Sequence, residues 1–104
     1  MIIRVIVTTF PSEDSAKKIV GHILNRKMVA CAQIEGPISS HYRWKGDTLN
    51  EKEWRVTMKT LPEIEKKLYQ AVSQEHPYDT SQWVSYDCET SEEYGCWVKE
   101  NVEP

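Results

Sequence analysis

The sequence predicts an α+β fold, built as one domain over residues 1–104, in which strands and helices alternate. Runs rich in β-branched and aromatic residues occur in four regions and are typical of strands. Two segments with apolar residues at helical spacing separate these runs, which favours crossover helices. No linker, internal repeat or low-complexity segment divides the chain, so a single domain is expected.

The first strand and the first helix are predicted at the start of the chain. Residues 2–9 form an apolar, β-branched run, which suits a strand in the centre of a sheet. Ser12 follows as an N-cap, with acidic residues after it that complement the positive end of a helix. The apolar positions of this helix then recur at helical spacing: Ala16, Ile19, Val20, Ile23 and Leu24.

A long hairpin is predicted next. Residues 28–34 return as a strand, and Gly36-Pro37 should kink it before alternation resumes in residues 38–44. Beyond a turn at Gly46, residues 53–59 alternate between apolar and mostly charged or polar side chains. The two arms therefore give a hairpin with one apolar face and one polar face.

A second helix, a last strand and a short terminal helix complete the chain. Thr60-Leu61-Pro62-Glu63 fits a capping box with proline in the first turn, and His76-Pro77 should end the helix. Residues 84–88 are expected to form the last strand, and Ser91 should cap a C-terminal helix. The second helix presents one apolar stripe: Leu61, Ile64, Leu68, Ala71 and Val72.

This order of elements, β-α-β-β-α-β plus a helix, predicts a ferredoxin-like split βαβ sandwich. Right-handed crossovers place both main helices on one face of the sheet, so the other face must be solvated or paired with another subunit. Trp44 and Trp54 flank the hairpin turn, where a monomer has little core. An interface between chains is favoured for these rings, and their packing on each other across the hairpin is the alternative.

Composition and charge exclude several kinds of partner. The net charge is -3 and basic residues occur only in isolated pairs, so neither nucleic acid nor an anionic membrane is expected as a partner. No apolar run approaches the roughly 20 residues of a membrane span, and residues 2–7 are too short for a signal peptide. The three widely spaced cysteines fit a reducing cytoplasm, which is the predicted location.

The sequence contains no signature of an enzyme. Its 4 glycines stand apart, so neither a phosphate-binding loop nor a dinucleotide fingerprint is present. Cys31 lies between alanines in a predicted strand with no neighbouring base to activate it. We therefore expect that the protein is not an enzyme.

One histidine is a candidate metal ligand. His22 falls on the polar side of the first helix, where it is expected to be solvated, and His41 lies on the polar face of its strand. His76 follows Glu75 at a helix end, and an imidazole beside a carboxylate suits a borderline divalent ion. The alternative is that His76 only caps the helix.

Motifs along nearly the whole chain resemble those of the CutA family, the divalent-cation tolerance proteins. The resemblance implies a homotrimer of ferredoxin-like subunits, similar in architecture to the PII signalling proteins, with clefts between subunits. It also implies a role in tolerance to copper and other divalent cations, and it places near those clefts Tyr42, Trp44, Glu53, Lys59 and Tyr78. The motifs are Thr8-Thr9-Phe10-Pro11, residues 24–32, Ser40-His41-Tyr42-Arg43-Trp44, Glu53-Trp54, His76-Pro77-Tyr78 and Tyr94-Gly95-Cys96-Trp97.

Two departures from the family pattern bear on metal binding. Family members proposed to bind copper carry cysteine at the position of Thr8 and His-His at the position of Glu75-His76. The resemblance therefore implies weak binding of copper or another divalent cation, with His76 and Glu75 as the candidates and no certain cofactor. Gln82 and Trp83 replace a usual glutamate and aliphatic residue, so an amide stands in place of a cleft carboxylate.

Two other functions remain open at this point. A PII-like trimer would sense a small molecule held between subunits, whereas a structural or adaptor trimer would bind none. Ligand binding by the purified protein would separate these functions.

Overall fold

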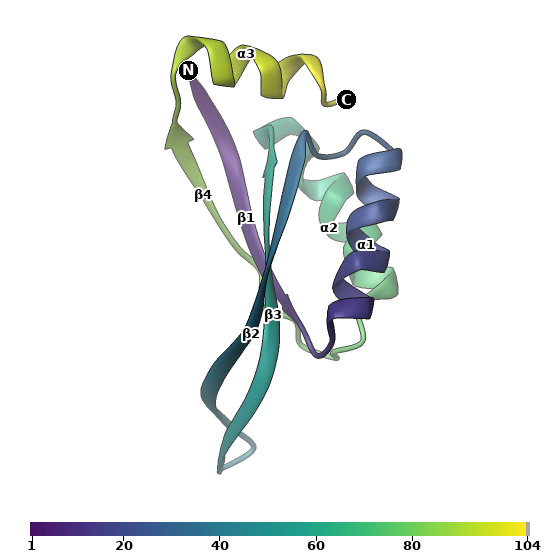
Figure 1. Ribbon diagram of the computed structural model, residues 1–104, viewed down its shortest axis with the longest axis vertical. Coiled ribbons are helices and arrows are strands. Elements are labelled where there is room, and N and C mark those ends of the chain that lie inside the picture. Colours follow the sequence, from purple (N-terminus) through teal and green to yellow (C-terminus); the bar gives the residue numbers. More distant parts are fainter. Residues whose placement is uncertain (104) are drawn as a thin grey trace.

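The computed structural model describes residues 1–103, and its strands form one four-stranded antiparallel sheet in the order β2-β3-β1-β4. Both α1 and α2 cover one face of this sheet, while α3 lies across its end near the N-terminus (Figure 1). This arrangement is the predicted α+β, ferredoxin-like class. The elements are β1 (Ile2–Phe10), α1 (Glu13–Asn25), β2 (Cys31–Trp44), β3 (Asp47–Thr60), the 3-10 helix η1 (Pro62–Ile64), α2 (Glu65–Glu75), β4 (Val84–Glu89) and α3 (Glu92–Glu100).

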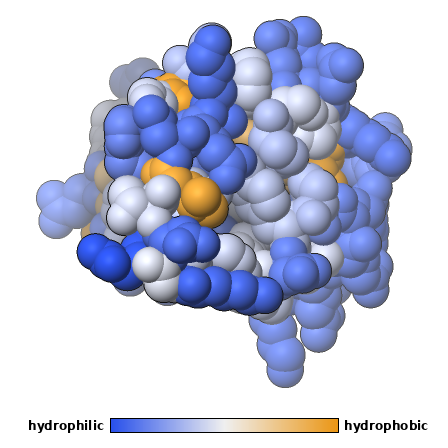
Figure 2. All heavy atoms as spheres, turned by 90° about the horizontal axis from the view of Figure 1, so that it is seen from below, coloured by the Kyte–Doolittle hydropathy of each residue, from blue (hydrophilic) through white to orange (hydrophobic). Residues whose placement is uncertain are grey.

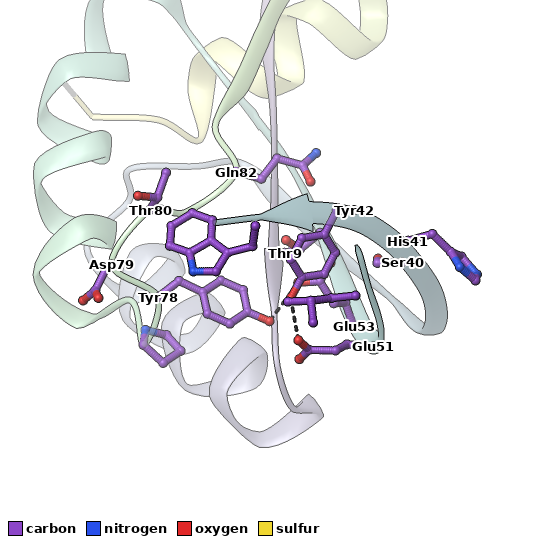
Figure 3. Close-up of a pocket in the computed structure, with 13 residues that line it drawn as sticks. Thr9, Ser40, His41, Tyr42, Glu51, Glu53, Tyr78, Asp79, Thr80 and Gln82 are labelled. Atoms are coloured by element: carbon purple, nitrogen blue, oxygen red, sulfur yellow. Dashed lines mark hydrogen bonds between the residues drawn. The ribbon is translucent and has the colours of Figure 1, made fainter. Parts of the chain in front are cut away.

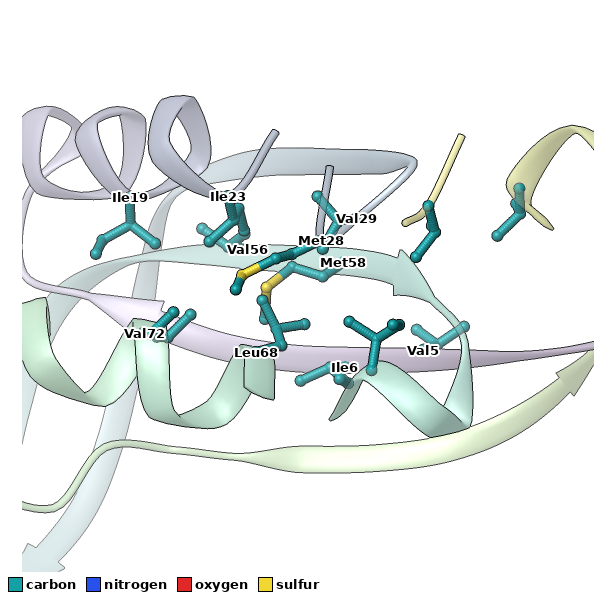
Figure 4. Packing of buried hydrophobic residues seen from close by; sticks show 14 of the residues in the cluster. Val5, Ile6, Ile19, Ile23, Met28, Val29, Val56, Met58, Leu68 and Val72 are labelled. Atoms are coloured by element: carbon teal, nitrogen blue, oxygen red, sulfur yellow. The ribbon is translucent and has the colours of Figure 1, made fainter. Parts of the chain in front are cut away.

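The core lies between the two main helices and the sheet (Figure 4). Fully buried side chains of α1 and α2 meet those of β1 and β3, as the apolar spacing of the helices predicts. Leu24 is an exception to that prediction, because it is 40% exposed. It lies one position past Ile23, and this turns its side chain away from the sheet. The core members include Ile6, Phe10, Ile19, Ile23, Val56, Met58, Leu68 and Val72.

The start of the second helix differs from its prediction. Thr60 is fully buried as the last residue of β3, and its hydroxyl donates a hydrogen bond of 2.7 Å to the carbonyl of Met28. It is therefore unavailable as a cap, and the expected capping box is wrong. The chain instead enters α2 through the 3-10 turn η1, which has no side-chain cap.

The two strands of the hairpin pair from Cys31 to Trp44, with one irregularity between Glu35 and Ile38. Gly36 lies in this irregularity, as the predicted kink requires. Lys45 and Gly46 both adopt positive φ, 49° and 86°, which is the backbone of a two-residue hairpin turn. The hairpin extends beyond the helices (Figure 1) and contributes to overall dimensions of 44 × 24 × 22 Å.

The two tryptophans of the hairpin have different surroundings. Trp44 lies opposite Asp47 and is 42% exposed, whereas Trp54 lies opposite Phe10 and packs against the hydrophobic core. The rings therefore do not form a cross-strand pair. Of the two tryptophans, Trp44 has the ring that another chain could contact.

None of the helices within residues 1–103 has the length and apolar character needed to cross a membrane.

Candidate functional site

A cleft of about 670 Å³ lies beside the hairpin, where the loop after α2 approaches β2 and β3. Figure 3 shows side chains from these three segments around it. The hairpin supplies rings and carboxylates because Tyr42 and Trp44 alternate on β2, and Glu51 and Glu53 alternate on β3, so each pair shares one face. The residues that define its chemistry are Tyr42, Trp44, Glu51, Glu53, Tyr78 and Asp79.

Two tyrosine–glutamate hydrogen bonds organise the cleft. The Tyr42 hydroxyl donates to Glu51 Oε1 at 2.5 Å, and the Tyr78 hydroxyl donates to Glu53 Oε2 at 2.8 Å. The second bond ties the loop after α2 to the hairpin, since Tyr78 and Glu53 are 25 residues apart. Both bonds are drawn in Figure 3, where the hydroxyl of Tyr78 points toward the hairpin.

Both tyrosines are held in the neutral form. The hydrogen bond to Glu51 is the main cause that raises the pKa of Tyr42 to about 12. Burial raises the pKa of Tyr78, and its hydrogen bond to Glu53 raises it further. The hydroxyls therefore remain donors at neutral pH and fix the positions of the two carboxylates.

The cleft carries uncompensated negative charge. Glu51, Glu53, Asp79 and His41 line it, and within residues 1–103 neither lysine nor arginine does. Within residues 1–103, none of these three carboxylates has an ion-pair partner. Viewed from the hairpin end, the surface is mostly hydrophilic with small, separate apolar spots (Figure 2). This arrangement favours cationic ligands.

His76 lies next to this cleft but is held by its own contacts. Its ring stacks on Phe10 with centroids 4.4 Å apart, and Nδ1 accepts a hydrogen bond of 3.1 Å from the Tyr78 amide. Its Nε2 lies 3.3 Å from the hydroxyl of Thr8. Burial lowers the pKa of His76, opposed by a backbone hydrogen bond with Thr9 and by the charge of Glu53.

The carboxylate of Glu75 contacts a histidine other than its sequence neighbour His76. Glu75 Oε1 lies 2.8 Å from Nδ1 of His22 on α1, so His22 contacts a carboxylate and the expectation that it is only solvated is wrong. Among residues 1–103, no group of three or more histidine, cysteine, aspartate or glutamate side chains has the geometry to hold a metal ion. His76 is therefore not part of a closed metal site within one subunit.

The other residues singled out in the sequence divide between the cleft and distant positions. Tyr42, Trp44, Glu53 and Tyr78 line the cleft together. Lys59 does not line it, because it lies near the far end of β3, where its ammonium is 5.5 Å from the ring centroid of Tyr94.

Two residues that depart from the family pattern also separate. Gln82 lines the cleft, as Figure 3 shows, but Trp83 does not. The indole of Trp83 donates a hydrogen bond of 3.0 Å to Glu65, and its ring makes an edge contact with Tyr69 at 5.0 Å. Trp83 thus serves packing against α2, whereas Gln82 contributes an amide to the site.

Glu51 is a cleft carboxylate that sequence reasoning missed. It lies two positions before Glu53 on the same strand, and this alternation places both carboxylates on one face. The alternation was a signal in the sequence, but its partner Tyr42 is identified only by the register of the hairpin.

The lowered pKa of His76 predicts how stability depends on pH. The unfolded chain binds this proton more tightly than the folded chain, so the free energy of unfolding should be retained above pH about 6.5 and should fall as the pH drops through the folded pKa. His76→Asn keeps an acceptor for the Tyr78 amide but does not titrate. Denaturant unfolding above and below pH about 6.5 should therefore show a weaker pH dependence in the variant than in the wild type. Equal dependence in both proteins would contradict this assignment.

Comparisons with known proteins agree with the fold and with the family resemblance. The family model of the CutA1 divalent ion tolerance protein matches residues 4–101. The divalent-cation tolerance protein CutA of Thermotoga maritima is 36% identical over 98 residues, which cover 93% of this chain and 96% of that protein.

Solved structures give the same result. The divalent cation tolerance protein (Cut A1) of Thermus thermophilus superposes with a TM-score of 0.93 at 31% identity, over 99% of this chain and 100% of the other. CutA1 from Pyrococcus horikoshii gives 0.91 at 30% identity, over 100% of both chains. The chain therefore belongs to the CutA1 divalent ion tolerance protein family.

Proposed function

We propose that this protein acts in divalent-cation tolerance as a non-enzymatic homotrimer that holds cations weakly. The observation that carries the proposal is the cleft beside the hairpin, which has three carboxylates and no lysine or arginine in its lining. Both of its tyrosines are held neutral, so neither supplies a phenolate base or nucleophile at neutral pH.

Exposed apolar groups support the trimer. Arg4 forms ion pairs with Asp87 of β4 and with Glu65 at the start of α2. Asp87 therefore lies on the helix side of the sheet. Alternation then directs Val84 and Tyr86 to the face that α1 and α2 leave uncovered. These two side chains are 48% and 49% exposed, and a second chain would shield them.

Light scattering tests the trimer directly. At low micromolar concentration the mass should be about 36 kDa, three times 12.1 kDa, because the uncovered sheet face and the hairpin need partners. Trp44→Ala should weaken assembly by about 2 kcal/mol or more, as truncation of a central interface aromatic commonly does. Trp97→Ala is the control, since this ring is 43% exposed on α3, away from the hairpin. A mass near 12.1 kDa, or equal dissociation of both variants, would contradict the proposal.

Calorimetry tests metal binding. We expect Cu²⁺ to bind best among first-row divalent ions, and weakly, with His76, which lies beside the cleft and not in its lining, as the ligand. The contact of its Nε2 with Thr8 is long, at 3.3 Å, and a metal could replace it. Because neutral imidazole binds and burial lowers the pKa of His76, affinity should persist to lower pH than at an exposed histidine.

Matched variants locate that metal. His76→Asn should remove most of the Cu²⁺ binding, whereas Glu75→Gln should leave it unchanged, because the structure directs Glu75 to His22. Tight binding that survives His76→Asn would place the metal elsewhere. A large effect of Glu75→Gln would return that carboxylate to the ligand set.

A further inference from the structure

We propose that the cleft beside the hairpin binds a linear polyamine, which carries several protonated amines on an alkyl chain. The proposal deepens the proposed function and rests on it in one respect, namely that the negative charge of this cleft attracts cations. It adds the chemical class of the ligand. The size of the cleft, its unpaired carboxylates and its aromatic walls support this ligand class.

The cleft is too large for a bare ion. Its volume of about 670 Å³ falls in the range of small-molecule sites, which is about 300–1,000 Å³. Within residues 1–103 no cluster of three metal-ligating side chains forms, so its carboxylates are not arranged as a coordination shell. An extended molecule with separated charges fits both facts.

The carboxylates are fixed and have free acceptor positions. Glu51 uses Oε1 and Glu53 uses Oε2 to accept the tyrosine hydroxyls, which leaves the second oxygen of each without a bond to a tyrosine. The two glutamates are two residues apart on one strand, so their backbones are separated by about 7 Å. Glu53 is half-buried and has no ion-pair partner within residues 1–103. Two separated ammonium groups would neutralise both carboxylates.

The aromatic walls suit the alkyl chain and the charge of a polyamine. Tyr42 and Trp44 both line the cleft, so their rings can contact a ligand there. Aromatic faces attract ammonium groups and also contact methylene groups. The ring of Trp44 already has a cation near it, because the ammonium of Lys45 lies 5.8 Å from its centroid. A divalent metal ion has no methylene groups and would not make these contacts with the rings.

The hydrogen-bonding groups distinguish a protonated amine from a quaternary ammonium. Each carboxylate can accept further hydrogen bonds, and Gln82 and Thr80 add other acceptors to the lining. A quaternary ammonium has no N–H group to donate. The site therefore matches a cation that donates hydrogen bonds.

Calorimetry and thermal shift with spermidine test the proposal at constant ionic strength. We expect saturable binding and an increased midpoint of thermal unfolding, and weaker effects from tetramethylammonium and Mg²⁺. Glu51→Gln and Glu53→Gln each keep an acceptor for their tyrosine and should lower the affinity for spermidine at least about tenfold. Trp44→Leu should lower it about three- to fivefold when measured on protein whose mass by light scattering equals that of the wild type.

Glu63→Gln is the matched control, because Glu63 is an exposed carboxylate on η1 that does not line the cleft. It should leave spermidine binding unchanged. Both variants should keep the unfolding midpoint of the wild type without ligand. If Glu53→Gln and Glu63→Gln then bind spermidine equally well, binding reflects diffuse charge and the proposal is overturned. Tetramethylammonium binding as tightly as spermidine would also overturn it.

The metal measurement separates this inference from the proposed function. If Cu²⁺ binds and spermidine does not, the polyamine site is wrong while the cation-tolerance function stands. If neither binds, both are wrong. If both bind, His76→Asn should affect Cu²⁺ alone and Glu53→Gln should affect spermidine most.

Discussion

Replacing Phe10 by alanine should lower the free energy of unfolding by about 3–5 kcal/mol, the usual cost of removing a buried phenylalanine. Phe10 is fully buried at the end of β1, where it lies opposite Trp54 of β3. Its ring also stacks on His76 at 4.4 Å, with an interplanar angle of 18°. The substitution therefore removes core packing and also the ring that stacks on the imidazole of His76.

The effect on His76 makes this prediction more specific than a loss of core volume. Burial is the main cause that lowers the pKa of His76, so water entering the cavity should raise that pKa toward its ordinary value. Denaturant unfolding at a fixed protein concentration measures the stability, and a histidine titration by NMR measures the pKa. Phe10→Leu, which keeps much of the apolar volume, is the control and should have the smaller effect on stability. A loss below about 1 kcal/mol with an unchanged pKa would contradict the packing described here.

Gly36→Ala should destabilise the protein by about 1–3 kcal/mol, the typical cost of overpacking. A Cβ atom at this position would lie 2.4 Å from Cδ1 and 2.7 Å from Cγ of Trp54. These are atoms of a rigid ring that packs against the core, so the ring cannot move away without disturbing its neighbours. The strain should appear in thermal and denaturant unfolding alike.

Two further variants isolate the cause. Gly21→Ala is the control, since nothing lies within 4 Å of the added Cβ and the residue is exposed on α1, where alanine should stabilise by about 1 kcal/mol. In a Trp54→Leu background the cost of Gly36→Ala should fall, because the flexible side chain can yield. Additive effects of the two substitutions would show that the contact with Trp54 is not the reason.

Local chemistry accounts for the parts of the fold that the sequence predicted well. Ser12 and Ser91 cap α1 and α3 as expected, each accepting a hydrogen bond from the amide three residues later. Gly46 takes the positive φ that the hairpin turn requires, and His76-Pro77 ends α2. Each of these features depends on residues a few positions apart, and such signals can be read directly from a sequence.

Local sequence patterns did not indicate the partner of a side chain where that partner lies in a distant segment. Thr60 has the residue type and the spacing of a helix cap, but it is buried and its hydroxyl donates to Met28, which is 32 residues away. Glu75 stands beside His76 in the sequence, yet its carboxylate contacts His22 on another helix. In both cases the contacting group lies in a segment that is distant in the sequence, and the neighbouring residues do not indicate it.

The sequence by itself determined the order of the elements, the face that each main helix buries and the family of the chain. Only the tertiary structure decided which charged and aromatic groups share a site. Strand register brought Glu51 to Tyr42, the loop after α2 brought Tyr78 to Glu53, and the length of β3 kept Lys59 away from them. The physical reason is that periodicity fixes the side on which a residue lies, whereas the contacts between segments that are distant in sequence depend on how the whole chain packs.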